Sequence, residues 1–103
     1  MPTATLLYKY RYDYEDGMIL EVVIWKLPEP VQGSQHCFKY RCFYGNAKYG
    51  RMIGYDNERP KGDHRHYGHV EKRYTFVTPD QLINDFLADV QQQRSQHNAN
   101  INN

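Results

Sequence analysis

Hydrophobic and polar residues alternate with a period of two in the first part of the chain, which predicts a strand with one aromatic side. Between residues 4 and 15, one face carries Leu6, Tyr8, Tyr10, Tyr12 and Tyr14. The other carries Leu7, Lys9, Arg11, Asp13 and Glu15. Asp16-Gly17 is a hairpin signal. The nearly continuous apolar run from 18 to 27 then predicts a central strand covered on both sides, with Trp25 in the core.

Shorter segments predict the other strands of a sheet. They span about 35–44, 48–56 and 63–69, and a short extended piece follows at 74–76. Gly45-Asn46 is expected to form a hairpin turn. Arg59-Pro60-Lys61-Gly62 suits a type I turn, because Pro stands at its second position and Gly at its fourth.

A helix is predicted to begin after Thr78. Thr78-Pro79-Asp80-Gln81 combines a capping Thr, a Pro at the first helical position and a Gln at the third. An apolar stripe at helical spacing follows, made of Leu82, Ile83, Phe86, Leu87 and Val90. From about Arg94 the chain is polar and loses this period, so residues 94–103 are expected to form a disordered tail.

Together these elements predict a single α+β domain over residues 1–93. It has two layers, an antiparallel meander of about five strands and one C-terminal helix packed on a face. A chain of 103 residues is long enough for one modest core. One helix covers only part of such a sheet, so the remainder is solvated, capped by loops or buried in a partner.

Composition narrows the function classes. Thirteen basic and twelve acidic residues give a net charge of +1, so any basic site for nucleic acid must be local. Cys37 and Cys42 point to opposite faces of one predicted strand and are expected not to form a disulfide. No apolar run is long enough to span a bilayer and no signal peptide opens the chain, so we expect a cytoplasmic protein without membrane contact.

Residues 54–66 contain the densest group of side chains that can transfer protons or bind charged ligands. This segment holds three carboxylates, three permanent cations, two histidines, a tyrosine and an amide. If Arg59–Gly62 is a tight turn, Asp56 lies opposite Arg65, Asn57 opposite His64, and Tyr55 opposite His66. The two histidines then share a face with Tyr55, roughly 7 Å from each other.

Three interpretations of this hairpin stay open. In the first, one histidine is a base, the other or Tyr55 is an acid, and Lys61 and Arg65 hold a phosphate. RNA cleavage needs no metal in such a site, because the 2′-hydroxyl is the nucleophile. In the second, His64 and His66 bind a divalent metal together with Asp63 or His69. In the third, the hairpin is a solvated turn held by local ion pairs.

A second polar pattern offers a binding surface. Lys9, Arg11, Lys39 and Arg41 alternate on predicted strands and are expected to form a basic stripe beside the exposed tyrosines. Such a stripe suits RNA, but it is also typical of the solvated face of an ordinary sheet.

Four segments resemble the TumE family of small bacterial toxins. They are residues 23–31 (VIWKLPEPV), 36–41 (HCFKYR), 54–59 (GYDNER) and 61–66 (KGDHRH). The resemblance extends from the first strand to the helix near residue 90. It implies a cytoplasmic toxin whose partner is a helix-turn-helix antitoxin encoded beside it. It supplies no catalytic residues.

We therefore predict the toxin of a type II-like toxin–antitoxin module that acts on RNA or translation, with ribonuclease chemistry and no cofactor or metal. The predicted catalytic residues are His64, His66 and Tyr55. The predicted substrate-binding residues are Lys61, Arg65 and Arg59. Asp56, Asn57, Glu58 and Asp63 are expected to orient these groups or to fix the hairpin. The alternative is a non-enzymatic binding protein that uses its tyrosine-rich sheet face, with Tyr8, Tyr10, Lys39 and Arg41 as its sensitive positions.

Overall fold

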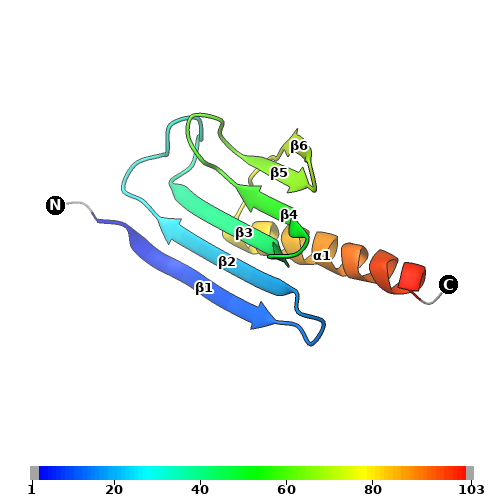
Figure 1. Ribbon diagram of the computed structural model, residues 1–103. Helices are drawn as coiled ribbons and strands as arrows, with labels where there is room; N and C mark the ends of the chain where they lie inside the picture. The colour runs from blue at the N-terminus through cyan, green and yellow to red at the C-terminus, as the bar shows by residue number, and fades with distance from the viewer. Residues whose placement is uncertain (1–2, 102–103) are drawn as a thin grey trace.

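A computed structural model describes residues 3–101, with the side chains of residues 3–96. Six strands form one antiparallel sheet in chain order (Figure 1). They are β1 (Thr5–Asp13), β2 (Ile19–Lys26), β3 (Phe38–Asn46), β4 (Gly50–Asp56), β5 (His64–Tyr67) and β6 (Val70–Arg73), and helix α1 (Pro79–Ile101) follows. The predicted α+β meander with one C-terminal helix is confirmed.

The additional strand comes from a turn inside the segment predicted as a single strand over 63–69. At Gly68 the chain adopts a φ of 60°, which glycine reaches without a steric penalty. Tyr67 then pairs with Val70 across a two-residue loop. The chain therefore folds back as β6 on the outer edge of β5.

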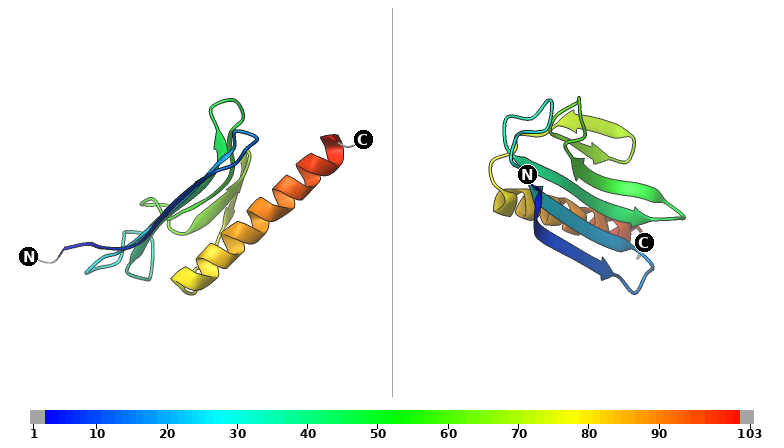
Figure 2. Two further views of the ribbon diagram at one scale, coloured as in Figure 1. Left: turned by 90° about the horizontal axis from the view of Figure 1, so that it is seen from below. Right: turned by 90° about the vertical axis from the view of Figure 1, so that its left-hand side faces the viewer.

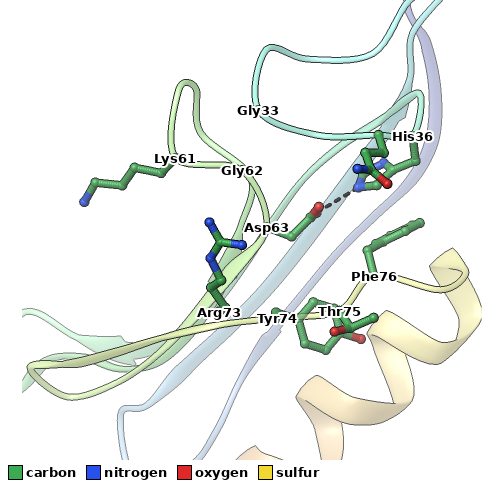
Figure 3. Close-up of a pocket in the computed structure, with 10 residues that line it drawn as sticks. Gly33, His36, Lys61, Gly62, Asp63, Arg73, Tyr74, Thr75 and Phe76 are labelled. Atoms are coloured by element: carbon green, nitrogen blue, oxygen red, sulfur yellow. Dashed lines mark hydrogen bonds and ion pairs between the residues drawn. The ribbon is translucent and has the colours of Figure 1, made fainter.

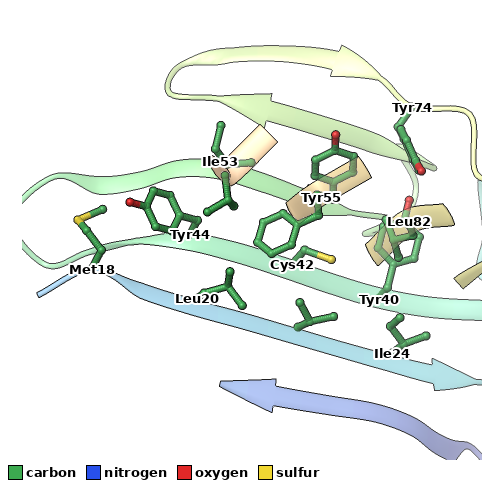
Figure 4. Close-up of a cluster of buried hydrophobic side chains, with 13 residues drawn as sticks. Met18, Leu20, Ile24, Tyr40, Cys42, Tyr44, Ile53, Tyr55, Tyr74 and Leu82 are labelled. Atoms are coloured by element: carbon green, nitrogen blue, oxygen red, sulfur yellow. The ribbon is translucent and has the colours of Figure 1, made fainter. Parts of the chain in front are cut away.

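Helix α1 lies against one face of the sheet (Figure 2). It begins as predicted, because the Gln81 N–H donates a 3.1 Å hydrogen bond to the Thr78 hydroxyl. Leu82, Phe86 and Val90 are buried against the sheet. The core between the layers also contains residues from the strands (Figure 4), among them Leu20, Val22, Ile24, Tyr40, Cys42, Tyr44, Ile53 and Tyr55.

The helix continues through Ile101, where the sequence pattern predicts a polar tail from about Arg94. Arg94, where the tail was predicted to begin, contacts residues of the sheet layer. Its guanidinium lies 3.0 Å from the Tyr44 hydroxyl and 3.0 Å from a carboxylate oxygen of Asp16, and it covers the Tyr14 ring. These contacts hold the helix against the β1–β2 hairpin. Residues 102–103 of the predicted tail lie outside the described part of the chain.

The sheet face opposite α1 carries no helix within residues 3–101, and we call it the open face. The prediction that β2 is covered on both sides is therefore wrong. Leu20, Val22 and Ile24 are buried under the helix, but the alternate residues of β2 point to the open face. Trp25, predicted as core, is 37% exposed there.

Strand β1 is an exposed edge strand that pairs only with β2. Tyr8, Tyr10 and Tyr12 point to the helix side of the sheet, because they pair with Ile24, Val22 and Leu20. There they line an open groove of about 540 Å³ with Ile83 and Leu87. Lys9 and Arg11 alternate with them and point to the open face, so the predicted basic stripe does not lie beside the tyrosines.

Candidate functional site on the open face

The turn between β4 and β5 differs from the predicted one by a single residue. It is closed by a 3.1 Å hydrogen bond from the Lys61 N–H to the Glu58 carbonyl, so Pro60 occupies its third position. A loop over residues 57–63 joins β4 to β5, and in the register of these strands Asp56 pairs with His64, Tyr55 with Arg65, and Gly54 with His66. The predicted pairs Asp56–Arg65 and Tyr55–His66 are wrong, and the shift changes which side chains share a face.

This register gathers Asp56, His64 and His66 on the open face, and we call them the Asp56 cluster. Their relative exposures are only 9%, 6% and 8%. His64 Nε2 lies 2.8 Å from Asp56 Oδ1, and His66 Nε2 lies 3.6 Å from Asp56 Oδ2. The two imidazole rings are 4.8 Å apart in an edge-to-face arrangement. A carboxylate and two imidazoles therefore share one buried position.

Both ring nitrogens of His64 face oxygen acceptors. Nδ1 lies 2.8 Å from the carbonyl oxygen of Gly62, and Nε2 faces the Asp56 carboxylate. A neutral imidazole carries only one N–H and satisfies only one of these contacts. With two protons, His64 donates to both oxygens and neutralises the buried carboxylate.

His66 has a different environment. Its Nε2 is buried and makes no hydrogen bond within the described residues. Burial lowers the pKa of His66, and the Arg51 guanidinium lowers it further, against the opposing effect of Asp56. The neutral ring is thus favoured, and it has a lone pair available next to His64.

Charged groups surround the Asp56 cluster. Arg51 Nη1 lies 3.7 Å from Asp56 Oδ2, and its side chain crosses Gly54, where a Cβ atom would lie 2.5 Å from Arg51 Cδ. Glu71 Oε1 lies 3.7 Å from His64 Nε2, and Lys61 contacts Glu71 at 3.5 Å. Next to Arg51 a hollow of about 460 Å³ opens, lined by Val23, Trp25, Lys39, Tyr40, Arg41, Arg51, Asp56 and Glu58.

Two residues predicted for this site point to the other side of the sheet. Tyr55 is fully buried under α1, where its hydroxyl donates to Asp89, and burial raises its pKa. Arg65 lies beside it and donates to the Tyr55 hydroxyl at 3.4 Å. The sheet separates both side chains from His64 and His66, because the true register places them on the helix face.

A second polar cluster lies at the end of the sheet, around Asp63 (Figure 3). One carboxylate oxygen of Asp63 accepts hydrogen bonds from the Tyr40 hydroxyl and from His36 Nε2, both at 2.7 Å. His36 Nδ1 accepts from the Phe38 N–H at 3.1 Å, so the ring proton lies on Nε2. His36 stacks on Phe76 beside a cavity of about 270 Å³ that Lys61 and Arg73 also line.

His36 was not predicted as part of a site, and the sequence offered little to find it. It precedes β3 in an irregular loop, 27 residues from Asp63. The loop reaches Asp63 because Gly33 and Gly62, both at positive φ, pack backbone against backbone. A Cβ on Gly62 would lie 2.5 Å from the Gly33 carbonyl oxygen.

The remaining predicted residues have structural or peripheral positions. Asn57 is fully buried, and its side-chain amide accepts from the Tyr40 N–H at 3.0 Å and donates to the Phe38 carbonyl at 2.6 Å. It thereby continues the hydrogen-bond ladder of β3 where β4 ends. The Glu58 N–H donates to Asp56 Oδ1 at 3.3 Å, and Arg59 is exposed in the turn.

The comparisons with known proteins give one match. The model of the Toxin TumE family matches residues 18–94. This chain belongs to the TumE toxin family. The match begins after β1 and includes both polar clusters. A search of curated proteins and a search of solved structures return no match.

Membership of the TumE family supports a toxin role and implies an antitoxin partner in general. No helix in the described residues is long and apolar enough to cross a membrane. In this TumE-family chain seven of the ten predicted site residues fall into three places. Asp56, His64 and His66 meet on the open face, Lys61 and Asp63 lie at the second cluster, and Tyr55 and Arg65 lie under the helix.

Proposed function

We propose that this TumE-family protein acts on RNA as a phosphodiester-cleaving toxin, with the Asp56 cluster as its catalytic centre. One observation carries the proposal. Asp56 contacts both buried imidazoles and also lines a hollow with Trp25, Lys39 and Arg41, on a sheet face that no described helix covers. His66 Nε2 has no hydrogen-bond partner within the described residues. Proton-transfer groups thus lie beside groups that suit a base and its phosphates.

The proposed reaction uses the two histidines in different protonation states. Neutral His66 takes the proton of the RNA 2′-hydroxyl at Nε2, and the 2′-oxygen attacks the adjacent phosphorus. The bond from phosphorus to the 5′-oxygen breaks, and doubly protonated His64 gives that oxygen its Nε2 proton. The products are a 2′,3′-cyclic phosphate and a 5′-hydroxyl, and no metal takes part.

Neighbouring residues have supporting roles in this proposal. Asp56 fixes the orientation of the His64 ring through the 2.8 Å contact with Nε2. Arg51 lies near enough to the cluster to stabilise the charge that develops on the phosphate oxygens. Trp25 offers an exposed ring on which a base can stack, and Lys39 and Arg41 bind the flanking phosphates.

We propose that the protein works in the cytoplasm, because both an RNA substrate and the antitoxin that the family implies are found there. We also propose that the antitoxin is of the helix-turn-helix class, which the resemblance of residues 54–66 to TumE sequences implies. Two experiments address these points, co-purification with the product of the neighbouring gene and protection of cells from growth arrest by that product.

RNA cleavage by the purified protein tests the catalytic proposal. We expect an unstructured RNA to be cleaved in the presence of EDTA, and we expect His64→Gln and His66→Gln to lower the rate by about 10² to 10⁴-fold. His69→Gln is the matched control, because His69 is exposed in the β5–β6 turn. Circular dichroism confirms that each variant is folded.

The substrate supplies a further control. Replacing the 2′-hydroxyl at the cleaved position by hydrogen should abolish cleavage, because the nucleophile is then missing. Cleavage by both histidine variants at the wild-type rate would contradict the assignment of the Asp56 cluster.

The open tyrosine groove beside β1 favours a second candidate, a non-enzymatic toxin that binds its target through this groove. Growth arrest separates the two functions. A binding toxin would still arrest growth with His64→Gln and His66→Gln, and would lose the effect with Tyr8→Ala and Tyr10→Ala. A catalytic toxin would show the reverse pattern.

A further inference from the structure

Three metal-ligating atoms converge in the Asp56 cluster. A ring nitrogen of His64, a ring nitrogen of His66 and a carboxylate oxygen of Asp56 all lie within 4.8 Å of one another, and all three residues are buried. The hypothesis of a metal at this hairpin, formed from the sequence, used Asp63 or His69 as the third ligand. The register of β4 and β5 supplies Asp56 instead.

The hydrogen bonds around the Asp56 cluster leave the Nε2 atoms of its two histidines in a position to bind a cation. His64 Nδ1 contacts the Gly62 carbonyl, which is the usual second contact of a histidine that binds metal through Nε2. His66 Nε2 is buried and makes no hydrogen bond within the described residues. With neutral rings whose protons lie on Nδ1, both Nε2 lone pairs face the Asp56 carboxylate, and a proton or a metal ion between them relieves that repulsion.

We propose that Asp56, His64 and His66 form a binding site for a divalent transition-metal ion of the Zn²⁺ type. Ligand atoms about 2.0–2.2 Å from a tetrahedral Zn²⁺ lie roughly 3.3–3.5 Å from each other. The two His–Asp contacts, 2.8 Å and 3.6 Å, are close to this spacing, so small side-chain rotations complete the site. Two imidazoles favour Zn²⁺, Co²⁺ or Ni²⁺ over Mg²⁺ or Ca²⁺.

Two neighbouring charges act on the bound ion in opposite directions. Glu71, whose carboxylate lies 3.7 Å from His64 Nε2, is placed to become the fourth ligand. Arg51 lies 3.7 Å from Asp56 and repels a metal ion until its partly exposed side chain moves away. Arg51→Gln should therefore tighten metal binding, whereas Glu71→Gln should weaken it.

Metal binding has a consequence for catalysis that rests on the proposed function. The ion occupies both Nε2 lone pairs, so His66 can no longer accept a proton and His64 can no longer donate one. Zn²⁺ is therefore an inhibitor of the cleavage proposed above. The metal site itself does not depend on that cleavage.

Titration of the full chain with ZnCl₂ by calorimetry, and with CoCl₂ by visible absorption, tests the site without RNA. We expect one ion per chain. His66→Gln and Asp56→Asn should weaken binding at least about 100-fold, the upper end of the losses known for outer-shell partners alone. His69→Gln and His36→Gln should bind as the wild type does, and thermal unfolding confirms that each variant is folded. Absence of saturable binding, or unchanged binding by His66→Gln, would overturn the site.

Cleavage measured in EDTA and in Zn²⁺ separates the two proposals. Metal binding together with inhibition supports both. Metal binding by a chain that cleaves no RNA supports the site and overturns the proposed function. Cleavage without metal binding overturns the site and supports the function. Faster cleavage in Zn²⁺ would overturn the inhibitory consequence.

Discussion

At the scale of single residues, His66 should make the stability of the domain depend on pH. Its pKa is lowered, chiefly by burial and then by Arg51. The unfolded chain, in which histidine titrates near about pH 6.5, then binds a proton more readily than the folded state. Protonation therefore favours unfolding as the pH falls below about 6.5, until it passes the folded-state pKa of His66.

The thermal midpoint measured at about pH 7.5 and at about pH 5.5 checks this expectation. The wild type should lose stability on acidification, and His66→Gln should lose less. His69→Gln, which removes an exposed histidine, should follow the wild type. A His66→Gln variant that loses as much stability on acidification as the wild type would contradict a lowered pKa of His66.

Asn57 illustrates what the sequence could indicate at this scale. Its position in a polar hairpin predicted a residue that fixes the turn, yet its amide bonds go to Phe38 and Tyr40 on another strand. An amide reproduces the donor and acceptor of a peptide group, so Asn57 replaces the strand partner that β3 lacks there. No local pattern encodes a partner 17 residues away.

Among the elements, the β4–β5 turn depends on the contact between Gly33 and Gly62. Gly62→Ala should cost about 3 kcal/mol, because a Cβ there meets the Gly33 backbone at a left-handed position. Gly68→Ala is the matched control, since Gly68 also has positive φ but a Cβ added there would have no neighbouring atom within 4 Å. It should cost only about 1–2 kcal/mol.

Urea unfolding of both variants measures the difference. The Gly62 carbonyl also contacts His64, so Gly62→Ala should disturb the Asp56 cluster while Gly68→Ala leaves it intact. Equal losses of unfolding free energy in the two variants would show that the close packing of Gly33 against Gly62 does not affect stability.

The strands and the start of the helix followed from alternation, helical spacing and capping, but the register did not. Pro60 and Gly62 are compatible with more than one tight turn, and the Glu58–Lys61 hydrogen bond selects the earlier one. The strand register differs from the predicted one by one residue, and it places Tyr55 and Arg65 away from the histidines and Asp56 beside them. The 27–37 loop packs against this turn through Gly33, a long-range contact that the local sequence does not indicate.

For the whole molecule, the attachment of α1 to the sheet relies on Asp89. Its carboxylate accepts hydrogen bonds from the hydroxyls of Tyr55 on β4 and Tyr67 on β5. Asp89→Ala should cost about 2–3 kcal/mol, since both hydroxyls lose a charged acceptor. Asp80→Ala, at the start of the same helix, should cost about 0.3–1 kcal/mol. Thermal unfolding of the two variants measures the difference, and equal shifts would contradict a role for Asp89 in docking.

The two layers of the molecule were predictable from the sequence, but it was not predictable which face of the sheet is covered and which is exposed. An apolar strand such as β2 gives the same signal whether one or both of its faces are covered, so Trp25 was predicted in the core. The structure exposes it on the open face, beside Lys39 and Arg41. The candidate site therefore includes an aromatic residue that the apolar strand pattern predicted in the core.

The division of β3 between two faces has a consequence for how substitutions will be tolerated. Even-numbered positions from Phe38 to Tyr44 point to the helix, and odd-numbered positions from Lys39 to Phe43 point to the open face. A systematic scan of this strand should therefore give two interleaved profiles. Changes at even positions would lower the abundance of the protein in cells, whereas changes at odd positions would leave abundance intact and act only on toxicity.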